Sequence, residues 1–169
     1  KLLGNLDVSK LKFPNKKFDL LSVLNGSKIV ACSDEHFGKA ENLLLPFKSK
    51  NMGNGWETRR RRGVGFDWVI IKLGKPGFIE NFDIQTHYFK GNYPSFCSVQ
   101  SYFSNTNINI NSIVNSSKKW EYLIKCLELK PHSSIKKQLS KKSKKINYIK
   151  LNIYPDGGIS RIRSIGKIL

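Results

Sequence analysis

Cysteine is scarce in this chain, and the sequence offers no obvious cross-link. Only three of the 169 residues are cysteines, Cys32, Cys97 and Cys126, and their spacing fits no metal-binding motif. An odd number of widely spaced cysteines is typical of free thiols in a reducing compartment, so we expect a cytoplasmic protein.

Long apolar runs are missing as well. No stretch approaches the roughly 18 apolar residues that a membrane-spanning helix needs. LLSVL at 20–24 is too short for the apolar core of a secretion signal. The sequence therefore predicts no membrane partner. A chain of this length is large enough to bury an apolar core as one domain.

Acidic residues are few, with 12 aspartates and glutamates against 30 lysines and arginines and a formal net charge of +18. Such an excess favours a polyanionic partner. Much of it is lysine that accompanies abundant asparagine and isoleucine, and all three are encoded by AT-rich codons. The base composition of the gene then accounts for much of the charge, and we do not expect nucleic acid as a partner.

Helical periodicity is also scarce, apart from a short segment around 38–46. Side chains alternate along 97–103 and 148–154 with the period of two that is typical of strands. Many short strands separated by glycine and proline turns are typical of a sandwich or barrel. The sequence therefore predicts an all-β, antiparallel fold.

Two motifs rich in glycine and proline predict tight turns. LGKPGF at 73–78 would join the strand 68–73 to one that follows it. PDGG at 155–158 would form a hairpin with the strand 148–154, because aspartate and glycine between two strand patterns favour a tight reversal.

Two other segments have the composition of insertions. Residues 104–117 are rich in asparagine and serine, and 133–145 contain six lysines. Both are typical of solvated, mobile loops, and for the lysine-rich loop solvation is favoured over contact with an anionic surface. We therefore predict a lead segment at 1–17 and a single domain at 18–169 that contains both insertions.

The most informative motif is GNGWETRRRR at 53–62. Its four arginines lie between a tryptophan of the kind usually buried and the apolar strand that begins near Trp68. A flexible tail does not place charge in such a position. The motif predicts several guanidinium groups on a rigid frame, and guanidinium binds carboxylates or phosphates through a fork of N–H donors.

Together with other motifs, this one resembles one repeat of the allantoicase family. The motifs in chain order are FDLLS at 18–22, SDEHFGKAENLL at 33–44, GNGWETRRRR at 53–62, DWVIIKLGKPG at 67–77, GNYP at 91–94 and LNIYPDGGISRIR at 151–163. The resemblance implies a galactose-binding-like jelly-roll β-sandwich. It also implies hydrolysis of allantoate to ureidoglycolate and urea, in purine (allantoin) degradation. Allantoicases usually carry two such repeats, so we expect this single repeat to form a homo-oligomer.

The implied reaction needs a proton donor at the leaving nitrogen and help for the incoming water. The acid–base candidates are Asp34, Glu35, Glu57 and His87. Each also has a structural interpretation, as a helix cap or turn carboxylate or as a structural histidine, and the sequence leaves both open.

The implied substrate, a small ureido compound, carries a carboxylate that arginines and amides can hold. The candidates are Arg59, Arg61, Arg161, Arg163 and Asn92 of GNYP. If 57–61 is extended, Arg59 and Arg61 share one face. The alternative is that these arginines form structural ion pairs with Glu35, Glu41, Glu57, Asp67 or Asp156. The histidines lack metal-ligand spacing, and we predict no metal or cofactor.

One departure bears on catalysis. Many allantoicases resemble DIDTSHFTGNYP where this chain reads DIQTHYFKGNYP at 83–94. Gln85 replaces an acid, and the histidine lies one place earlier, at His87. Because a shift of one residue reverses the face of a strand, the alternative function is a non-catalytic jelly-roll module that binds an anionic or carbohydrate ligand.

Overall fold

The structure is a computed structural model that describes residues 17–169. The predicted lead segment at 1–17 therefore lies outside the described residues, except for Lys17. No helix in the described part is long and apolar enough to cross a membrane.

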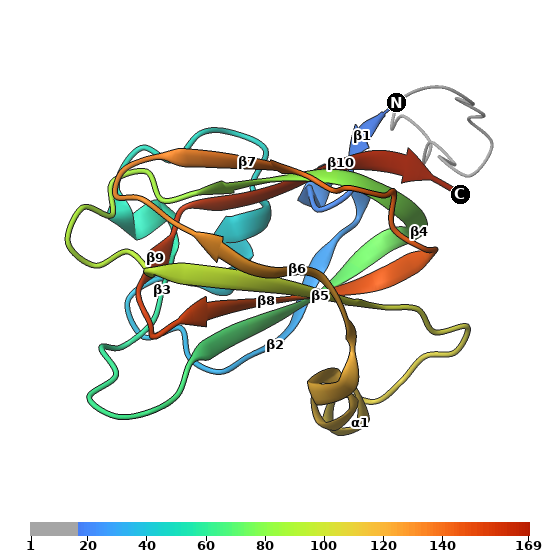
Figure 1. The fold of residues 1–169 in the computed structure, drawn as a ribbon, viewed down its shortest axis with the longest axis horizontal. Helices are drawn as coiled ribbons and strands as arrows, with labels where there is room; N and C mark the ends of the chain where they lie inside the picture. Colours follow the sequence, from blue (N-terminus) through green and yellow to red (C-terminus); the bar gives the residue numbers. More distant parts are fainter. Residues whose placement is uncertain (1–16) are drawn as a thin grey trace, which may run out of the picture.

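The chain folds into two antiparallel β-sheets that share one long strand, β4 (Asp67–Gln85) (Figure 1). In the first sheet, the start of β4 pairs with β2 and β8, and the sheet continues through β5 to β6. The bounds of its other strands are β2 Lys28–Cys32, β5 Phe96–Tyr102, β6 Glu121–Glu128 and β8 Ile146–Tyr154.

In the second sheet, the end of β4 pairs with β10 and β7, and β10 also pairs with β1. The bounds of these strands are β1 Phe18–Asp19, β7 Ser134–Gln138 and β10 Arg161–Ile168. A two-residue ladder joins β3 (Trp56–Glu57) to β9 (Gly158–Ile159). Every strand pair is antiparallel, which confirms the predicted all-β, antiparallel class.

The interior side chains of both sheets form the main core, which includes Val69, Ile84, Val99, Leu151 and Ile162. A smaller cluster covers the outer face of the first sheet, where Ile113 of helix α1 (Ile110–Ser116) packs with Ile70, Trp120 and Tyr148. Because both faces of β5 and β8 are covered, polar side chains such as Gln100 and Lys150 are buried as well.

The turn predicted at 73–78 is wrong, because β4 continues through it. Its register against β8 shifts between Lys72 and Gly77, and the strand passes from the first sheet to the second. The glycines mark close contacts and not a reversal. A Cβ on Gly74 would overlap the carbonyl oxygen of Asn25, and one on Gly77 would overlap Leu20.

The hairpin predicted at PDGG is also wrong, because β8 and β10 lie on opposite sides of β4 and do not pair with each other. The loop instead crosses from one sheet to the other through β9. A Cβ on Gly158 would overlap the ring of Phe89, and Gly157 has a φ of 126°. Glycine therefore suits both positions, at Gly157 because the backbone has a positive φ and at Gly158 because a side chain would not fit.

Short helices fill the remaining connections. The helix expected around 38–46 is a 3-10 helix, η3 (Ala40–Leu44). The other 3-10 helices are η2 Val23–Asn25, η4 Met52–Asn54 and η5 Ser117–Lys119. The predicted insertions contain regular structure, because 104–117 includes α1 and 133–145 includes β7. The mobility of these two segments stays a prediction.

Candidate functional site

The arginine motif forms a loop at the end of the sandwich where β8 finishes. Its first anchor is Trp56, which is fully buried and whose Nε1–H donates to the main-chain oxygen of Asp34 at 2.8 Å. Trp56 also pairs with Ile159 across the β3–β9 ladder. A bulky apolar side chain with one satisfied donor thus fixes the position from which the arginines depart.

Two carboxylates hold the main chain of this loop from opposite ends of the sequence. Asp34 Oδ2 accepts the N–H of Arg59 at 2.6 Å, and Asp156 Oδ2 accepts the N–H of Arg61 at 2.8 Å. Hydrogen bonds to ionised acceptors are stronger than neutral ones. The main chain of the loop is therefore held at two points, Arg59 and Arg61, which are two residues apart.

Two of the four guanidinium groups have partners. Arg59 Nη2 lies 2.9 Å from His36 Nδ1. Arg61 forms an ion pair with Asp67, whose side chain is only 2% exposed and also accepts a hydrogen bond from Ser33 at 2.9 Å. Because guanidinium has no acceptor, Nδ1 of His36 must accept, and the ring proton then lies on Nε2.

The other two guanidinium groups, those of Arg60 and Arg62, have no hydrogen-bond or ion-pair partner within residues 17–169. They border a cavity of about 490 Å³. Its lining consists of Asp34, Arg59, Arg60, Arg61, Arg62, Gly63, Val64 and Asp67. With four arginines against two aspartates, this cavity attracts an anion.

The sequence motifs at this end contact one another. Asn92 of GNYP donates its side-chain amide to Glu57 Oε1, and its main-chain oxygen accepts the N–H of Gly158 at 2.8 Å. Thr58 Oγ1 accepts the N–H of Gly157 at 3.1 Å. The predicted site residues Glu57 and Asn92 are thus paired with each other, next to the arginine loop but outside the lining of its cavity.

Glu35 has the contacts of a helix cap. Its Oε2 accepts the N–H of Ala40, the first residue of η3, at 3.1 Å, and its Oε1 forms an ion pair with Lys39 at 2.7 Å. The hydrogen bond from Lys39 lowers the pKa of Glu35. Its role as a catalytic acid or base stays a prediction, and its observed contacts match the structural alternative.

His87 also lies outside the lining of the arginine cavity. Its N–H donates to Ser160 Oγ at 3.0 Å, and its ring centroid lies 5.6 Å from that of His132. The neighbouring Tyr88 has a positive φ of 72°, and its N–H donates to His132 Nδ1 at 2.8 Å. A catalytic role for His87 likewise stays a prediction.

Arg161 is fully buried and holds the segment 45–54. Its Nε–H donates to the carbonyl oxygen of Phe47 at 2.8 Å, and its Nη1 donates to that of Asn54 at 2.5 Å. Nη2 is buried without a partner. Burial lowers the pKa of Arg161 to about 10, and the nearby positive charge of Arg163 acts in the same direction.

Arg163 holds the same segment through the carbonyl oxygen of Leu45. Its Nε lies 3.6 Å from Asp19 Oδ2, and burial lowers its pKa. The structure thus separates the predicted arginines into two groups. Arg59 and Arg61 belong to the cavity, whereas Arg161 and Arg163 contact the 45–54 segment. Substrate binding by Arg161 and Arg163 stays a prediction.

The sequence favoured Arg59 and Arg61 over Arg60 and Arg62 as substrate ligands, and it did not select His36. An alternating chain places Arg60 and Arg62 opposite Arg59 and Arg61, so the sequence did signal that the two pairs differ. Asp67 was one of several acids expected as ion-pair partners, and the structure shows that it pairs with Arg61.

Metal ligands do not gather in the part of the chain that the structure describes, where no three His, Cys, Asp or Glu side chains form a group that could hold an ion. The three cysteines are free thiols. Burial raises the pKa of Cys32 to about 11 and that of Cys97 to about 12.

Comparison with known proteins assigns the family. A family model described as the allantoicase repeat matches residues 18–169. The chain belongs to the allantoicase family. A probable allantoicase from Pseudomonas fluorescens (strain SBW25) is 45% identical over 156 residues, which cover 91% of this chain and 46% of that protein. One from Acinetobacter baumannii (strain AYE) is 43% identical, over 89% of this chain and 45% of that protein.

Solved structures agree with this family assignment. The crystal structure of allantoicase from Saccharomyces cerevisiae has a TM-score of 0.78 and 35% identity, and it matches 91% of this chain and 44% of that one. A family 32 carbohydrate-binding module from Streptococcus pneumoniae has a TM-score of 0.63 at 12% identity, over 89% of this chain and all of that one. The predicted galactose-binding-like jelly roll is confirmed. The similarity to the carbohydrate-binding module concerns the fold alone.

The chain spans about half the length of the allantoicases that it matches. This agrees with the prediction that it represents one of two repeats.

Proposed function

We propose that this chain takes part in the hydrolysis of allantoate to ureidoglycolate and urea, in purine degradation. Family membership supports the reaction, and one structural observation supports the arginine cavity as the place where the substrate binds. The guanidinium groups of Arg60 and Arg62 have no partner among the described residues, and they lie at the edge of a cavity that is also lined by a carboxylate, Asp34. An anionic substrate that reacts with water needs this combination of groups.

In this proposal the substrate carboxylate binds Arg60 and Arg62, while Arg59 and Arg61 are kept in place by His36 and Asp67. Guanidinium groups bind carboxylates through paired N–H donors, which fix orientation as well as position. The main-chain bond from Arg59 to Asp34 sets the distance between the substrate anchor and the proposed base.

Asp34 is the proposed acid–base group. Its Oδ2 accepts the N–H of Arg59, which leaves Oδ1 free to accept a proton from the attacking water. The new C–O bond forms at the central carbon as the C–N bond to one ureido group breaks. The proton then passes from Asp34 to the leaving nitrogen, and urea departs. His36, which carries its proton on Nε2 in the observed contact, is a second possible donor.

The test is release of urea from allantoate by the purified chain, with and without an added divalent metal ion. Arg60→Lys and Arg62→Lys keep the charge and lose the fork, so each should lower kcat/KM by about ten- to a hundredfold. Asp34→Asn keeps an acceptor for the N–H of Arg59 and removes the base, so it should lower kcat. Lys28→Ala, at an exposed position of β2, serves as the control.

The proposal fails if the arginine variants retain the activity of the parent chain. If the parent chain releases no urea yet binds allantoate saturably in calorimetry, the non-catalytic module becomes the better interpretation. Binding of a sugar in place of allantoate would support the carbohydrate form of that alternative.

We also infer that the chain self-associates. The chain spans about half the length of the relatives that it matches, and in this proposal the single repeat packs against another copy of itself. Sedimentation at micromolar concentration tests this, and a monomer would overturn it. The free thiols further support the proposal of a cytoplasmic protein.

A further inference from the structure

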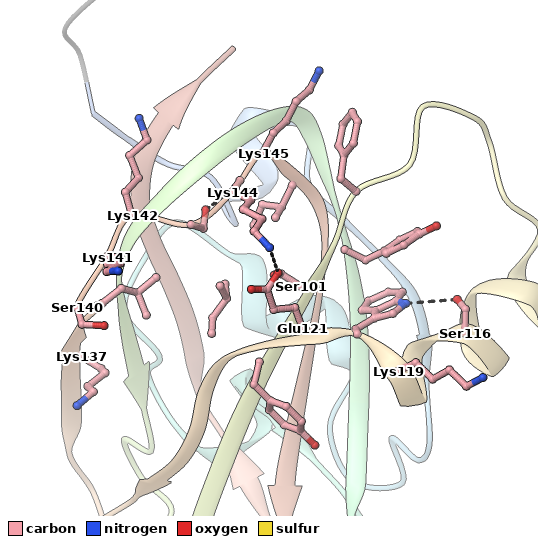
Figure 2. Close-up of a pocket in the computed structure, with 18 of the residues that line it drawn as sticks. Ser101, Ser116, Lys119, Glu121, Lys137, Ser140, Lys141, Lys142, Lys144 and Lys145 are labelled. Carbon is pink, nitrogen blue, oxygen red and sulfur yellow. Dashed lines mark hydrogen bonds and ion pairs between the residues drawn. The ribbon is translucent and has the colours of Figure 1, made fainter.

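A larger cavity lies at the other end of the sandwich. Its volume is about 1040 Å³, and it lies between the start of β6, the end of β7 and the loop 139–145 (Figure 2). Strand β8 connects the two ends, because Ile146 lines this cavity whereas Ile153 pairs with Asp67 of the arginine cavity. At about 3.3 Å per residue the cavities are over 20 Å apart, too far for one small ligand to occupy both.

Lysine dominates the lining of this cavity, which we name the lysine groove. Its lysines are Lys119, Lys137, Lys141, Lys142, Lys144 and Lys145. The single acidic residue of the lining is Glu121, and Lys144 Nζ already lies 3.0 Å from it. The groove therefore keeps a large positive excess and attracts an anionic ligand.

The lysines differ in how free they are. Lys142 and Lys145 lie over aromatic rings, at 4.1 Å from the centroid of Phe78 and 4.4 Å from that of Phe103. Lys119, Lys137 and Lys141 have no side-chain partner among residues 17–169, and Lys119 lies across the groove from the other two in Figure 2. Free ammonium groups on both sides suit an extended ligand with several negative charges.

The floor of the groove is partly apolar. Leu139 and Ile146 of the lining are already buried in the main core, whereas Leu123 is only partly buried and Tyr122 is 47% exposed. A ligand made only of phosphate or sulfate would leave this apolar surface in water. Burial of apolar groups on the floor stabilises a complex by roughly 25 cal/mol per Å², so the ligand should carry apolar as well as anionic groups.

Single-stranded nucleic acid suits the groove less well, because it binds such surfaces by stacking bases on free aromatic faces. Here Trp120 is already stacked on Tyr102, with centroids 5.3 Å apart and an interplanar angle of 12°. Lys145 lies over the ring of Phe103. Of the four aromatic residues in the lining, Tyr122 alone is exposed enough to stack a base.

The chain itself is also a poor occupant. Its first sixteen residues contain four lysines and one aspartate, and the whole chain has a formal net charge of +18. Neither that segment nor a second copy complements a positive groove. The partner must supply the negative charge that this protein lacks.

We propose that the lysine groove docks an acidic polypeptide segment of another protein. Carboxylates of the segment bind Lys119, Lys137 and Lys141, and its apolar side chains pack on Tyr122 and Leu123. Such a segment supplies the two features that the groove requires, namely several anionic groups and apolar groups between them.

The test is fluorescence anisotropy of the purified chain with a labelled peptide in which glutamates alternate with leucines. Two matched peptides separate the contributions, one with serine in place of leucine and one with lysine in place of glutamate. A labelled oligo-deoxythymidine tests the nucleic-acid alternative. The double variant Lys137→Glu with Lys141→Glu is compared with Lys28→Glu with Lys48→Glu, which makes the same charge change at exposed positions outside the groove.

The glutamate–leucine peptide should bind most tightly, and the groove variant should weaken it by at least about tenfold relative to the control variant. Tyr122→Ser should weaken this peptide and leave the serine peptide unaffected. Equal binding of the leucine and serine peptides, tighter binding of the oligonucleotide, equal effects of the two double variants, or no binding of the peptide by the parent chain would each overturn the proposal. Circular dichroism establishes that each variant is folded.

Discussion

The carboxylate of Asp156 accepts a hydrogen bond from the main-chain N–H of Arg61, which lies 95 positions earlier in the sequence. This contact ties the loop between β8 and β9 to the loop that carries the arginines. Asp34 makes the matching contact at Arg59, so the arginines depart from a main chain that is held by two carboxylates. The position of the guanidinium groups therefore depends on residues that need not contact the substrate.

This dependence can be measured at Asp156. Asp156→Ala removes the acceptor for Arg61 N–H and should lower kcat/KM for allantoate by about tenfold, because a charged hydrogen bond contributes about 1.5–3 kcal/mol and part of it is lost to solvent at this exposed site. Asp156→Asn keeps an oxygen acceptor and should recover much of the loss. An equal loss in both variants would show that the negative charge, and not the position of the loop, is what matters.

Arg161 should matter for stability more than for binding. Arg161→Met leaves the carbonyl oxygens of Phe47 and Asn54 without their donor, so we expect the free energy of unfolding to fall by at least about 2 kcal/mol in urea titration. Cleavage by a protease within 45–54 should also become faster. Arg62→Met, at an exposed residue without a partner in the described part of the chain, is the control and should leave stability nearly unchanged.

A different result at Arg161 would revise its role. If Arg161→Met is as stable as the parent chain and allantoate binding is lost, the side chain binds substrate, as the sequence motif predicted, and does not hold the 45–54 segment.

Gly158 should be intolerant of a side chain. A Cβ at this position overlaps the ring of Phe89, so Gly158→Ala should destabilise the fold by about 1–3 kcal/mol, the usual effect of overpacking. Gly63→Ala, where no atom lies within 4 Å of the added Cβ, is the matched control. Phe89→Leu should partly rescue Gly158→Ala in thermal denaturation, and the absence of rescue would place the strain elsewhere.

The three thiols should react at different rates. The thiolate is the reactive form, and burial raises the pKa of Cys97 to about 12 and that of Cys32 to about 11, so both remain protonated at pH 8. Cys126 is exposed. Iodoacetamide followed by mass spectrometry should therefore label Cys126 first and Cys97 last. Raising the pH to 10 should not bring Cys97 to the rate of Cys126 while the protein stays folded.

The alternation of apolar side chains predicted the strands and the sheet class correctly, because that signal is local. It did not predict the connections. LGKPGF and PDGG have the composition of tight turns, yet their glycines are required by Leu20, Asn25 and Phe89, which are distant in the sequence. A glycine-rich motif shows that the side chains there are small and the backbone is flexible. Whether the segment then turns or continues as a strand depends on the distant residues that pack against it.

The candidate site was likewise predictable only in part. Four arginines on a rigid loop were predictable from the neighbouring tryptophan and glycines. The sequence did not show which of them are engaged, because that depends on His36 and Asp67, which the fold brings to Arg59 and Arg61. Likewise, Arg161 resembles a substrate ligand in the sequence, and only the fold shows that the 45–54 segment covers it.

The sharing of β4 between both sheets has a consequence for how the domain opens. Its residues pair with β2 and β8 in one sheet and with β10 and β7 in the other, so neither sheet can detach without breaking the ladder of the strand they have in common. Local opening should therefore be confined to edges such as β6 and β7. The amides of β4 should exchange with deuterium only when the whole domain unfolds, as one cooperative unit.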